Sequence, residues 1–297
     1  MTKKQTPGNQ ALIEELTADL VTHLLKGDRT KCELLAYETL KIGFSPNMIY
    51  TLIFSPAISE IGQLWHEGKT TIAHEHLSTE IIHSLVDLIM GQSPLTQNNG
   101  FSVVTTSVEG ERHVLASKMF ASLLTLEGFS VHYLGSETPS RDLTAYVDQN
   151  GIDVVTLSII LESNIPRAAE CTHALTALEK SPLILFGGNA VIRNPSYFRA
   201  GYVVPDFYSG LAKIESVLGL KSNVDSLNSI LSTVGRTIKE TRVTRGMNQG
   251  DLARKASVDR AYISLVENGK QNLTMSALVN LARALSVPIS SIIPQDK

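Results

Sequence analysis

The stretch GERHVLA, residues 110–116, places a lone histidine, His113, between a run typical of a β-strand and a run typical of a helix. Its imidazole either lies on the surface at a helix start or is presented by the loop to a ligand. Glu111 precedes His113 by two residues, so its carboxylate can accept a hydrogen bond from one ring nitrogen and fix the tautomer. The pair therefore indicates a candidate ligand-binding loop.

Two further groups of residues could take part in binding. In GQLWHEGKTTIAHEHLSTE, residues 62–80, the chain's only tryptophan, Trp65, is followed ten and eleven residues later by Glu75 and His76. Taken alone, Trp65 fits a core position and the Glu–His pair fits a solvated helix face. Later in the chain, strand-like runs end at the residues Ser158, Gly187 and Gly188. A Gly–Gly pair by itself is a weak signal, because many turns require a positive φ.

The pattern of apolar residues indicates three domains. Spacings of three and four over 10–92 predict a bundle of helices. Over 100–220, strand-like and helix-like runs alternate, which predicts an α/β, Rossmann-like parallel sheet with helices on both faces. Ligands of such sheets bind on the loops beyond the carboxyl ends of the strands, and GERHVLA is the first of these loops. The remaining segment, 226–297, has only helix-like runs.

Composition favours a soluble protein of the cytoplasm. The chain has 297 residues, of which 43% are hydrophobic and 19% charged, and no apolar run reaches the length of a membrane span. The N-terminus is polar and then amphipathic, unlike a signal peptide. Cys32 and Cys171 follow no metal or redox spacing, so we expect buried thiols in a reducing compartment. We expect no membrane partner.

Charge is distributed unevenly along the chain. Residues 226–297 contain ten Lys/Arg and five Asp/Glu, a net charge of +5, whereas residues 1–225 contain 16 and 24, a net charge of −8. A basic segment attached to an acidic body suggests that only the C-terminal segment meets a polyanion. A charge of +5 on a small domain also arises by chance, so this pattern alone decides nothing.

The C-terminal segment resembles the Cro/repressor-type (XRE) helix-turn-helix family almost from end to end. The matching motifs are TRGMNQGDLA, SVDRAYISLVENGK and LVNLARALSVPISSII. The resemblance implies a double-stranded DNA operator as partner, with one helix in the major groove. The residues predicted to contact DNA are Asn248, Gln249, Asp259, Arg260, Ala261, Ser264, Asn268 and Lys270.

Individual residues of this segment differ in their expected roles. Asn248 and Gln249 begin a helix, where backbone N–H groups and a side-chain amide can hold a phosphate. Arg260 can bind guanine O6 and N7 in a bidentate manner. Arg242 and Glu267 match positions that form an internal ion pair in the family, which favours a scaffold role for Arg242.

The loop around His113 resembles that of the B12-binding domain shared by methionine synthase, corrinoid carrier proteins and CarH-type photoreceptors. The family carries an Asp/Glu-x-His-x-x-Gly loop, matched here by Glu111 to Ala116. The resemblance implies that His113 is the lower ligand of cobalt and that Glu111 accepts its hydrogen bond. Ser158 matches the family's serine after the third strand, and the resemblance implies that the Gly187–Gly188 loop allows close approach of the cofactor's nucleotide tail. Ala116 stands where the family has glycine.

The spacing of Trp65, Glu75 and His76 is similar to that in the helical cap of CarH-type regulators. The resemblance implies that Trp65 packs over the upper face of adenosylcobalamin, with Glu75 and His76 in the same region. It further implies that the histidine can bind cobalt after light removes the adenosyl group.

Together these features predict a cobalamin-dependent, light-responsive transcriptional regulator, and not an enzyme. Adenosylcobalamin would control homo-oligomerisation, to a dimer or tetramer, and thereby DNA binding. CarH-type proteins carry a different, MerR-type DNA domain at the N-terminus, so the direction of the switch does not transfer. Two alternatives stay open: a light-independent sensor of cobalamin or another tetrapyrrole, and, less favoured, a corrinoid methyl carrier.

Overall fold

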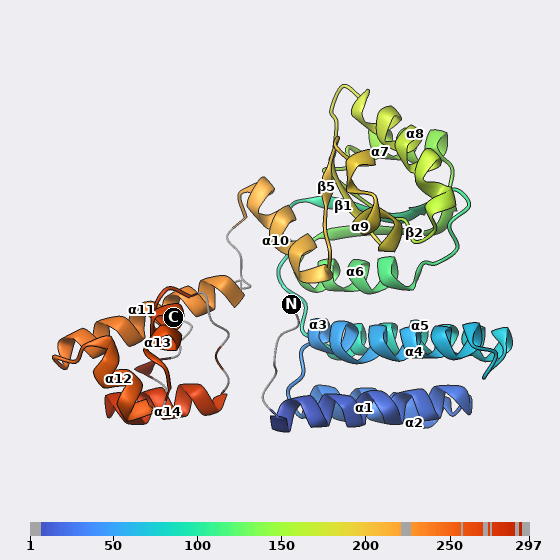
Figure 1. Cartoon of the computed structure of the whole chain (residues 1–297). Helices are drawn as coiled ribbons and strands as arrows, with labels where there is room; N and C mark the ends of the chain where they lie inside the picture. Colours follow the sequence, from blue (N-terminus) through green and yellow to red (C-terminus); the bar gives the residue numbers. More distant parts are fainter. Residues whose placement is uncertain are drawn as a thin grey trace. The chain divides into compact units, whose positions relative to one another are not determined.

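The computed structural model of the chain describes residues 7–220, 227–256, 258–269, 273, 275–288 and 291–292. These residues form two compact units, one spanning Ile13–Gly219 and one that contains the segment from Leu220 onward. Figure 1 shows the helices and strands of each unit. A helical bundle and a parallel sheet make up the first unit, and helices make up the second, which confirms the predicted fold class.

The bundle comprises α1 (Pro7–Leu25), α2 (Arg29–Lys41), α3 (Pro46–Ile49), a π-helix η1 (Tyr50–Phe54), α4 (Ser55–His66) and α5 (Ile72–Gln92). Two of these helices begin at a side-chain cap. Asp28 accepts from the backbone N–H of Lys31 at 3.2 Å, and Ser45 accepts from that of Met48 at 3.3 Å. Such caps satisfy N–H groups that a helix start leaves unpaired. Apolar side chains of α1, α2, η1, α4 and α5 form one buried core.

The sheet of the described residues has five parallel strands in the order β2-β1-β3-β4-β5. They are β1 (Ser102–Val108), β2 (Ser130–Thr138), β3 (Val154–Ser158), β4 (Leu183–Gly187) and β5 (Tyr202–Val203). The helices between and after them are α6 (Leu115–Leu126), α7 (Ser140–Asn150), α8 (Ile165–Thr176), α9 (Asn189–Arg193) and α10 (Phe207–Leu218), with short 3₁₀ turns η2 (Glu162–Asn164) and η3 (Pro195–Tyr197).

Helices cover both faces of this sheet. Residues of α7 and α8 share a core cluster with β1, β3 and β4. Met119 and Leu123 of α6 belong instead to the core of the bundle, so α6 joins the bundle to the other face of the sheet. In the ladder, Ser107 of β1 pairs with Ser158 of β3, and Ser158 pairs with Gly187 of β4. The carboxyl ends of the three central strands therefore meet at one edge.

The second unit contains α11 (Leu227–Thr244), α12 (Gln249–Ala256), α13 (Arg260–Glu267) and α14 (Met275–Leu285) among its described residues. Its core is formed by one apolar side of each helix, with Ile238, Leu252, Ile263 and Leu281 at most 1% exposed. None of the helices in the described ranges is both long and apolar enough to cross a bilayer.

The two cysteines are buried free thiols, as predicted. Burial raises the pKa of Cys32 and of Cys171 to about 11. A thiol with such a pKa stays protonated near neutral pH, which makes both cysteines poor nucleophiles and poor metal ligands.

Candidate functional site

Glu111 is fully buried in the loop after β1 and is surrounded by hydrogen-bond donors. One carboxylate oxygen accepts from His113, through the backbone N–H at 3.1 Å and ring Nδ1 at 2.5 Å. The other oxygen accepts from the loop after β3, namely from the backbone N–H groups of Ile160 and Leu161, both at 2.9 Å, and from Asn164 Nδ2 at 3.1 Å. The carboxylate therefore joins two neighbouring βα loops.

These contacts shift the pKa values of both partners. Burial by itself raises the pKa of Glu111, but the hydrogen bonds from His113, Leu161 and Ile160 outweigh burial and lower it to about 2. The hydrogen bond to Glu111 raises the pKa of His113, and the charges of Glu111 and Glu75 add to the rise. An imidazole that donates to a carboxylate is also a more basic metal ligand.

His113 presents its ring to solvent although its carboxylate partner is buried. The side chain of His113 is 56% exposed and that of Glu111 is 0% exposed. Because Nδ1 is held by Glu111, Nε2 is the nitrogen that faces a ligand. The predicted geometry of a carboxylate-oriented imidazole is thus present.

The end of β2 supports this loop from the other side. Glu137 adopts a positive φ of 54°, which is unusual for a residue with a side chain. Its backbone N–H donates to the Glu111 carbonyl at 3.3 Å, and its carboxylate pairs with Arg112 at 3.3 Å. No local motif marks Asn164 and Glu137, so the sequence did not predict that these two residues support the loop.

On the bundle, the predicted cap residues lie where α4 ends and α5 begins. Trp65 is 45% exposed, so it is not a core residue. His76 Nδ1 lies 2.7 Å from a Glu75 oxygen, and Thr79 donates to the other oxygen at 3.1 Å. Glu75 and His76 therefore form a hydrogen-bonded pair near the start of α5.

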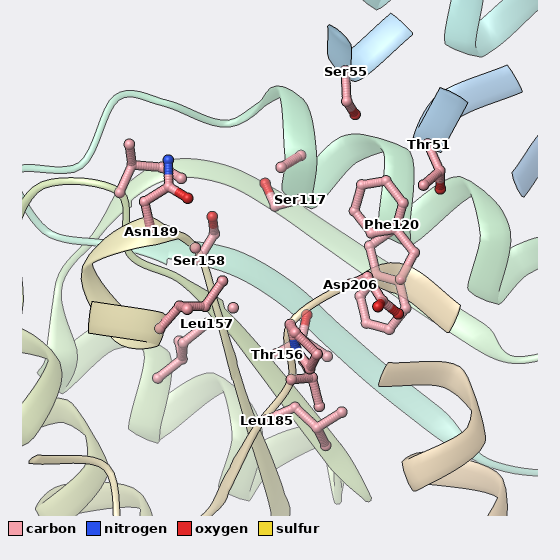
Figure 2. A pocket seen from close by; sticks show the side chains of 18 residues that line it. Thr51, Ser55, Ser117, Phe120, Thr156, Leu157, Ser158, Leu185, Asn189 and Asp206 are labelled. Atoms are coloured by element: carbon pink, nitrogen blue, oxygen red, sulfur yellow. The ribbon is translucent and has the colours of Figure 1, made fainter. Parts of the chain in front are cut away.

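A cavity of about 400 Å³ extends over β3 and β4. Its lining comes from the bundle, from α6, from β3 and β4, and from the start of α10: Thr51, Ser55, Ala116, Ser117, Phe120, Thr156, Leu157, Ser158, Ile160, Leu185, Gly187, Gly188, Asn189, Ile192, Val204, Pro205, Asp206 and Phe207. Figure 2 shows side chains pointing into it from both the sheet and the helices. Ile160 lines the cavity and also donates to Glu111, so the cavity adjoins the histidine loop.

Ser158, Gly187 and Gly188 all line this cavity, but the two glycines differ in what they do. Gly188 has a φ of 108°, and a Cβ built there lies 2.2 Å from the Ile159 carbonyl oxygen. The fold itself therefore requires glycine at 188. At Gly187 a Cβ meets nothing within 4 Å and enters open space. Glycine at 187 keeps room for a ligand.

This difference yields a paired prediction. Gly188→Ala is expected to destabilise the first unit, because the methyl group overlaps a backbone carbonyl and φ is unfavourable. Gly187→Ala is expected to keep the melting temperature and to weaken corrinoid binding, because its methyl group occupies the cavity. Thermal unfolding and spectroscopic titration measure the two effects. An unchanged affinity for Gly187→Ala would remove this glycine from the binding site.

Ala116, the departure from the family loop, is an exposed residue in the first turn of α6 and lines the cavity. The cavity keeps its volume of about 400 Å³ with this methyl group in place. The substitution therefore does not close the site.

The metal-ligating side chains near the cavity suit a metal ion that is already bound in a macrocycle. Among the described residues no group of three or more His, Cys, Asp and Glu side chains could hold a bare metal ion. His113 supplies one oriented nitrogen beside a cavity with open space at Gly187. These residues fit a corrinoid, because its ring would already hold the metal, His113 would add one nitrogen ligand, and the cavity would take the nucleotide tail.

The helix-turn-helix of the second unit consists of α12 and α13. On α13, Arg260 and Ala261 are exposed and Ser264 is half-buried, whereas Ile263 and Val266 are buried. Asp259, also exposed, precedes the helix as its N-cap. One side of α13 thus packs on the core and leaves the predicted reading side open.

Other predicted DNA contacts also make contacts within the unit. Asn248 Oδ1 accepts from the backbone N–H of Asp251 at 2.9 Å and caps α12. Gln249 Nε2 donates to Glu267 at 2.9 Å, so the amide nitrogen of Gln249 is engaged within the domain. Asn268 is exposed and donates to the Ser264 carbonyl at 2.7 Å. Lys270 lies outside the described residues.

Comparisons with protein families match three segments of the chain. Two families described as B12 binding domain match residues 16–90 and 101–204. A family described as helix-turn-helix matches residues 238–292.

Individual relatives and solved structures are similar to parts of the chain. The dimethylamine corrinoid protein 1 of Methanosarcina acetivorans is 23% identical over 185 residues, 60% of this chain and 84% of the relative. The structure of the monomethylamine corrinoid protein of Methanosarcina barkeri matches with a TM-score of 0.61 and 15% identity, over 69% of this chain and 99% of that chain. The restriction-modification controller protein C.AhdI of Aeromonas hydrophila is 30% identical, over 21% of this chain and 96% of that chain, with a TM-score of 0.21.

Proposed function

Because the chain joins two B12-binding segments to a helix-turn-helix segment, we propose that it is a cobalamin-dependent transcriptional regulator. Adenosylcobalamin is the proposed cofactor, and light is the proposed signal. The proposed regulator acts in the cytoplasm as a homo-oligomer that binds a double-stranded DNA operator, and the cofactor controls its assembly.

One observation carries this proposal. A buried carboxylate orients an exposed imidazole beside a cavity, in the same chain as a segment that matches a helix-turn-helix family. A cobalamin-loaded enzyme needs the first feature but has no use for the second.

Each residue has a proposed role at the cofactor. His113 binds cobalt through Nε2, and Glu111 holds the ring in the required tautomer. Ser158, Gly187 and Gly188 surround the nucleotide tail. Trp65, Glu75 and His76 would contact the cofactor from the bundle. When bound, adenosylcobalamin supplies a cobalt–carbon bond that light can break.

The test uses the full chain purified with adenosylcobalamin in the dark. Its absorption spectrum, its mass in solution and its retention of DNA fragments selected from a random pool are recorded before and after illumination. We expect the cofactor to co-elute, and light to change both mass and DNA retention. If no cobalamin co-elutes, the proposed function is wrong; if light changes neither property, the light response alone is wrong.

Cobalamins with different upper ligands distinguish a light-responsive regulator from a light-independent sensor. If methylcobalamin and hydroxocobalamin control DNA retention as well as the adenosyl form does, the protein responds to cobalamin and not to light.

Similarity to a dimethylamine corrinoid protein favours a second candidate, a corrinoid methyl carrier. A carrier would accept a methyl group from a partner methyltransferase and would retain no DNA sequence selectively.

Arg260 gives a prediction for the DNA side of the proposal. Its side chain begins the exposed face of α13, where bidentate contact with guanine is worth about 1–3 kcal/mol of discrimination. Arg260→Ala is expected to weaken binding to selected DNA by that amount and to weaken nonspecific binding much less. Fluorescence anisotropy measures both. Arg199→Ala, the same charge change on an exposed residue of the other unit, is the control.

A further inference from the structure

The cavity has an aromatic wall next to a carboxylate. The rings of Phe120 on α6 and Phe207 on α10 are stacked, with centroids 5.9 Å apart and planes within 12°. Gly210 allows this approach, because a Cβ there would lie 2.8 Å from the Phe120 ring. Asp206, the residue before Phe207, lines the same cavity. In the view of Figure 2, Phe120, Asp206 and Thr51 lie at one end, away from Ser158.

Three of the hydroxyl groups that line the cavity donate to other groups of the protein and are left as acceptors. Thr51 donates its hydroxyl hydrogen to Asn47 Oδ1 at 3.1 Å, Ser55 to the Tyr50 carbonyl at 2.7 Å, and Ser117 to the Val114 carbonyl at 2.7 Å. Each oxygen then has only lone pairs left for a ligand. The Asp206 carboxylate, which accepts from the backbone N–H of Ser209 at 2.7 Å, is also an acceptor. These three hydroxyl oxygens and the Asp206 carboxylate can therefore pair with a ligand that carries hydrogen-bond donors.

We propose that this end of the cavity selects the base of the corrinoid's nucleotide tail, favouring a purine base with N–H donors, such as adenine, over dimethylbenzimidazole. This inference rests on the proposed function. The aromatic pair supplies a flat apolar surface for a base, and the acceptors meet its exocyclic amine. A dimethylbenzimidazole base has no N–H group to offer them. The negative charge of Asp206 also keeps the tail's phosphate away from this end, which leaves the base to occupy it.

The size of the selectivity follows from exposure. When a polar site is fully buried, a ligand that cannot make the hydrogen bond is discriminated against by a factor of about ten thousand or more. Asp206 is exposed, so water still solvates its carboxylate when no donor is present. We therefore expect a preference of about tenfold, the ratio that one partly hydrated hydrogen bond to a charged group supplies.

The experiment compares three corrinoids on the full-length protein: adeninylcobamide, cobalamin and cobinamide, which lacks the tail. Dissociation constants are measured by spectroscopic titration in the dark. The wild type is expected to bind adeninylcobamide about tenfold more tightly than cobalamin. Asp206→Asn removes the negative charge, so it is expected to lower this ratio and to leave cobinamide binding unchanged. Asparagine caps helices as well as aspartate does, so α10 retains its N-cap.

A matched control exists in the bundle. Asp28→Asn makes the same change at the N-cap of α2, where the carboxylate accepts from Lys31 and lies outside the cavity lining. It is expected to leave all three affinities unchanged. Equal affinity of the wild type for the two tailed corrinoids, or an unchanged ratio in Asp206→Asn, would overturn the inference alone. Failure of the wild type to bind even cobinamide would overturn the proposed function as well.

Discussion

Replacement of His113 by alanine is expected to abolish the histidine-coordinated absorption spectrum of the bound corrinoid. His113 is the oriented imidazole of the loop, and in the proposed complex it would supply the nitrogen that binds cobalt. The nucleotide tail still has its cavity, so we expect the variant to retain weaker binding. Titration of the full chain with hydroxocobalamin gives both the spectrum and the affinity.

Glu111→Gln tests the same ligand by changing its partner, and it is expected to weaken corrinoid binding while His113 is kept. The amide is close in volume but lacks the charge that holds His113 Nδ1 and the N–H groups of Ile160 and Leu161. Loss of a partner that orients a metal-bound histidine lowers metal affinity about 10–100-fold. His74→Ala is the control, since His74 is an exposed histidine whose ring contacts Thr71 at 2.7 Å. A His113→Ala protein with an unaltered spectrum would show that another group ligates cobalt.

The sequence predicted the centre of the site better than its supports. Glu111 and His113 are two residues apart, so one loop sets their geometry and a local motif reveals them. Asn164 and the N–H groups of Ile160 and Leu161 reach Glu111 from about 50 residues away. Only the pairing of β1 with β3 brings those groups to the carboxylate. No spacing rule within one segment describes such contacts.

Where a residue type fits two roles in the sequence, its surroundings in the folded protein distinguish between them. Trp65 suited a core position or a ligand-facing position, and its 45% exposure excludes the core. Gly187 and Gly188 looked equivalent, yet only Gly188 has a positive φ and a carbonyl in the way of a Cβ. Gln249 was predicted to hold a phosphate, but its amide nitrogen donates to Glu267, a contact that depends on how α12 packs against α13.

The Arg242–Glu267 pair, by contrast, was predicted as internal and is internal. The guanidinium donates twice to the carboxylate, at 2.5 and 2.9 Å, and also donates to the Met247 carbonyl at 2.8 Å. Their side chains are 9% and 2% exposed. The pair connects α11 to the end of α13, so it fixes the helix that carries the predicted DNA contacts.

Arg242→Met is expected to destabilise the second unit by about 3–5 kcal/mol, because it leaves the Glu267 carboxylate buried without its cation. For a domain of this size, such a loss lowers the melting temperature by at least about 12 °C. Scanning calorimetry of the full chain measures it, and corrinoid binding by the first unit serves as the internal control. Arg254→Ala breaks the exposed pair with Asp251 and is expected to change the melting temperature far less, because exposed ion pairs contribute little to stability.

The same pair gives the second unit a defined pH dependence. Burial raises the pKa of Glu267, but the hydrogen bonds from Arg242 and Gln249 outweigh burial and lower it. A carboxylate with a lowered pKa in the folded state stabilises fully above its unfolded pKa, and that stabilisation disappears as pH falls through the folded pKa. The second unit should therefore melt at lower temperature on acidification below about pH 4.3. Compared with the wild type, Glu267→Gln should have a lower melting temperature at neutral pH and a smaller fall in melting temperature on acidification. A fall as steep as that of the wild type would assign the acid sensitivity to other carboxylates.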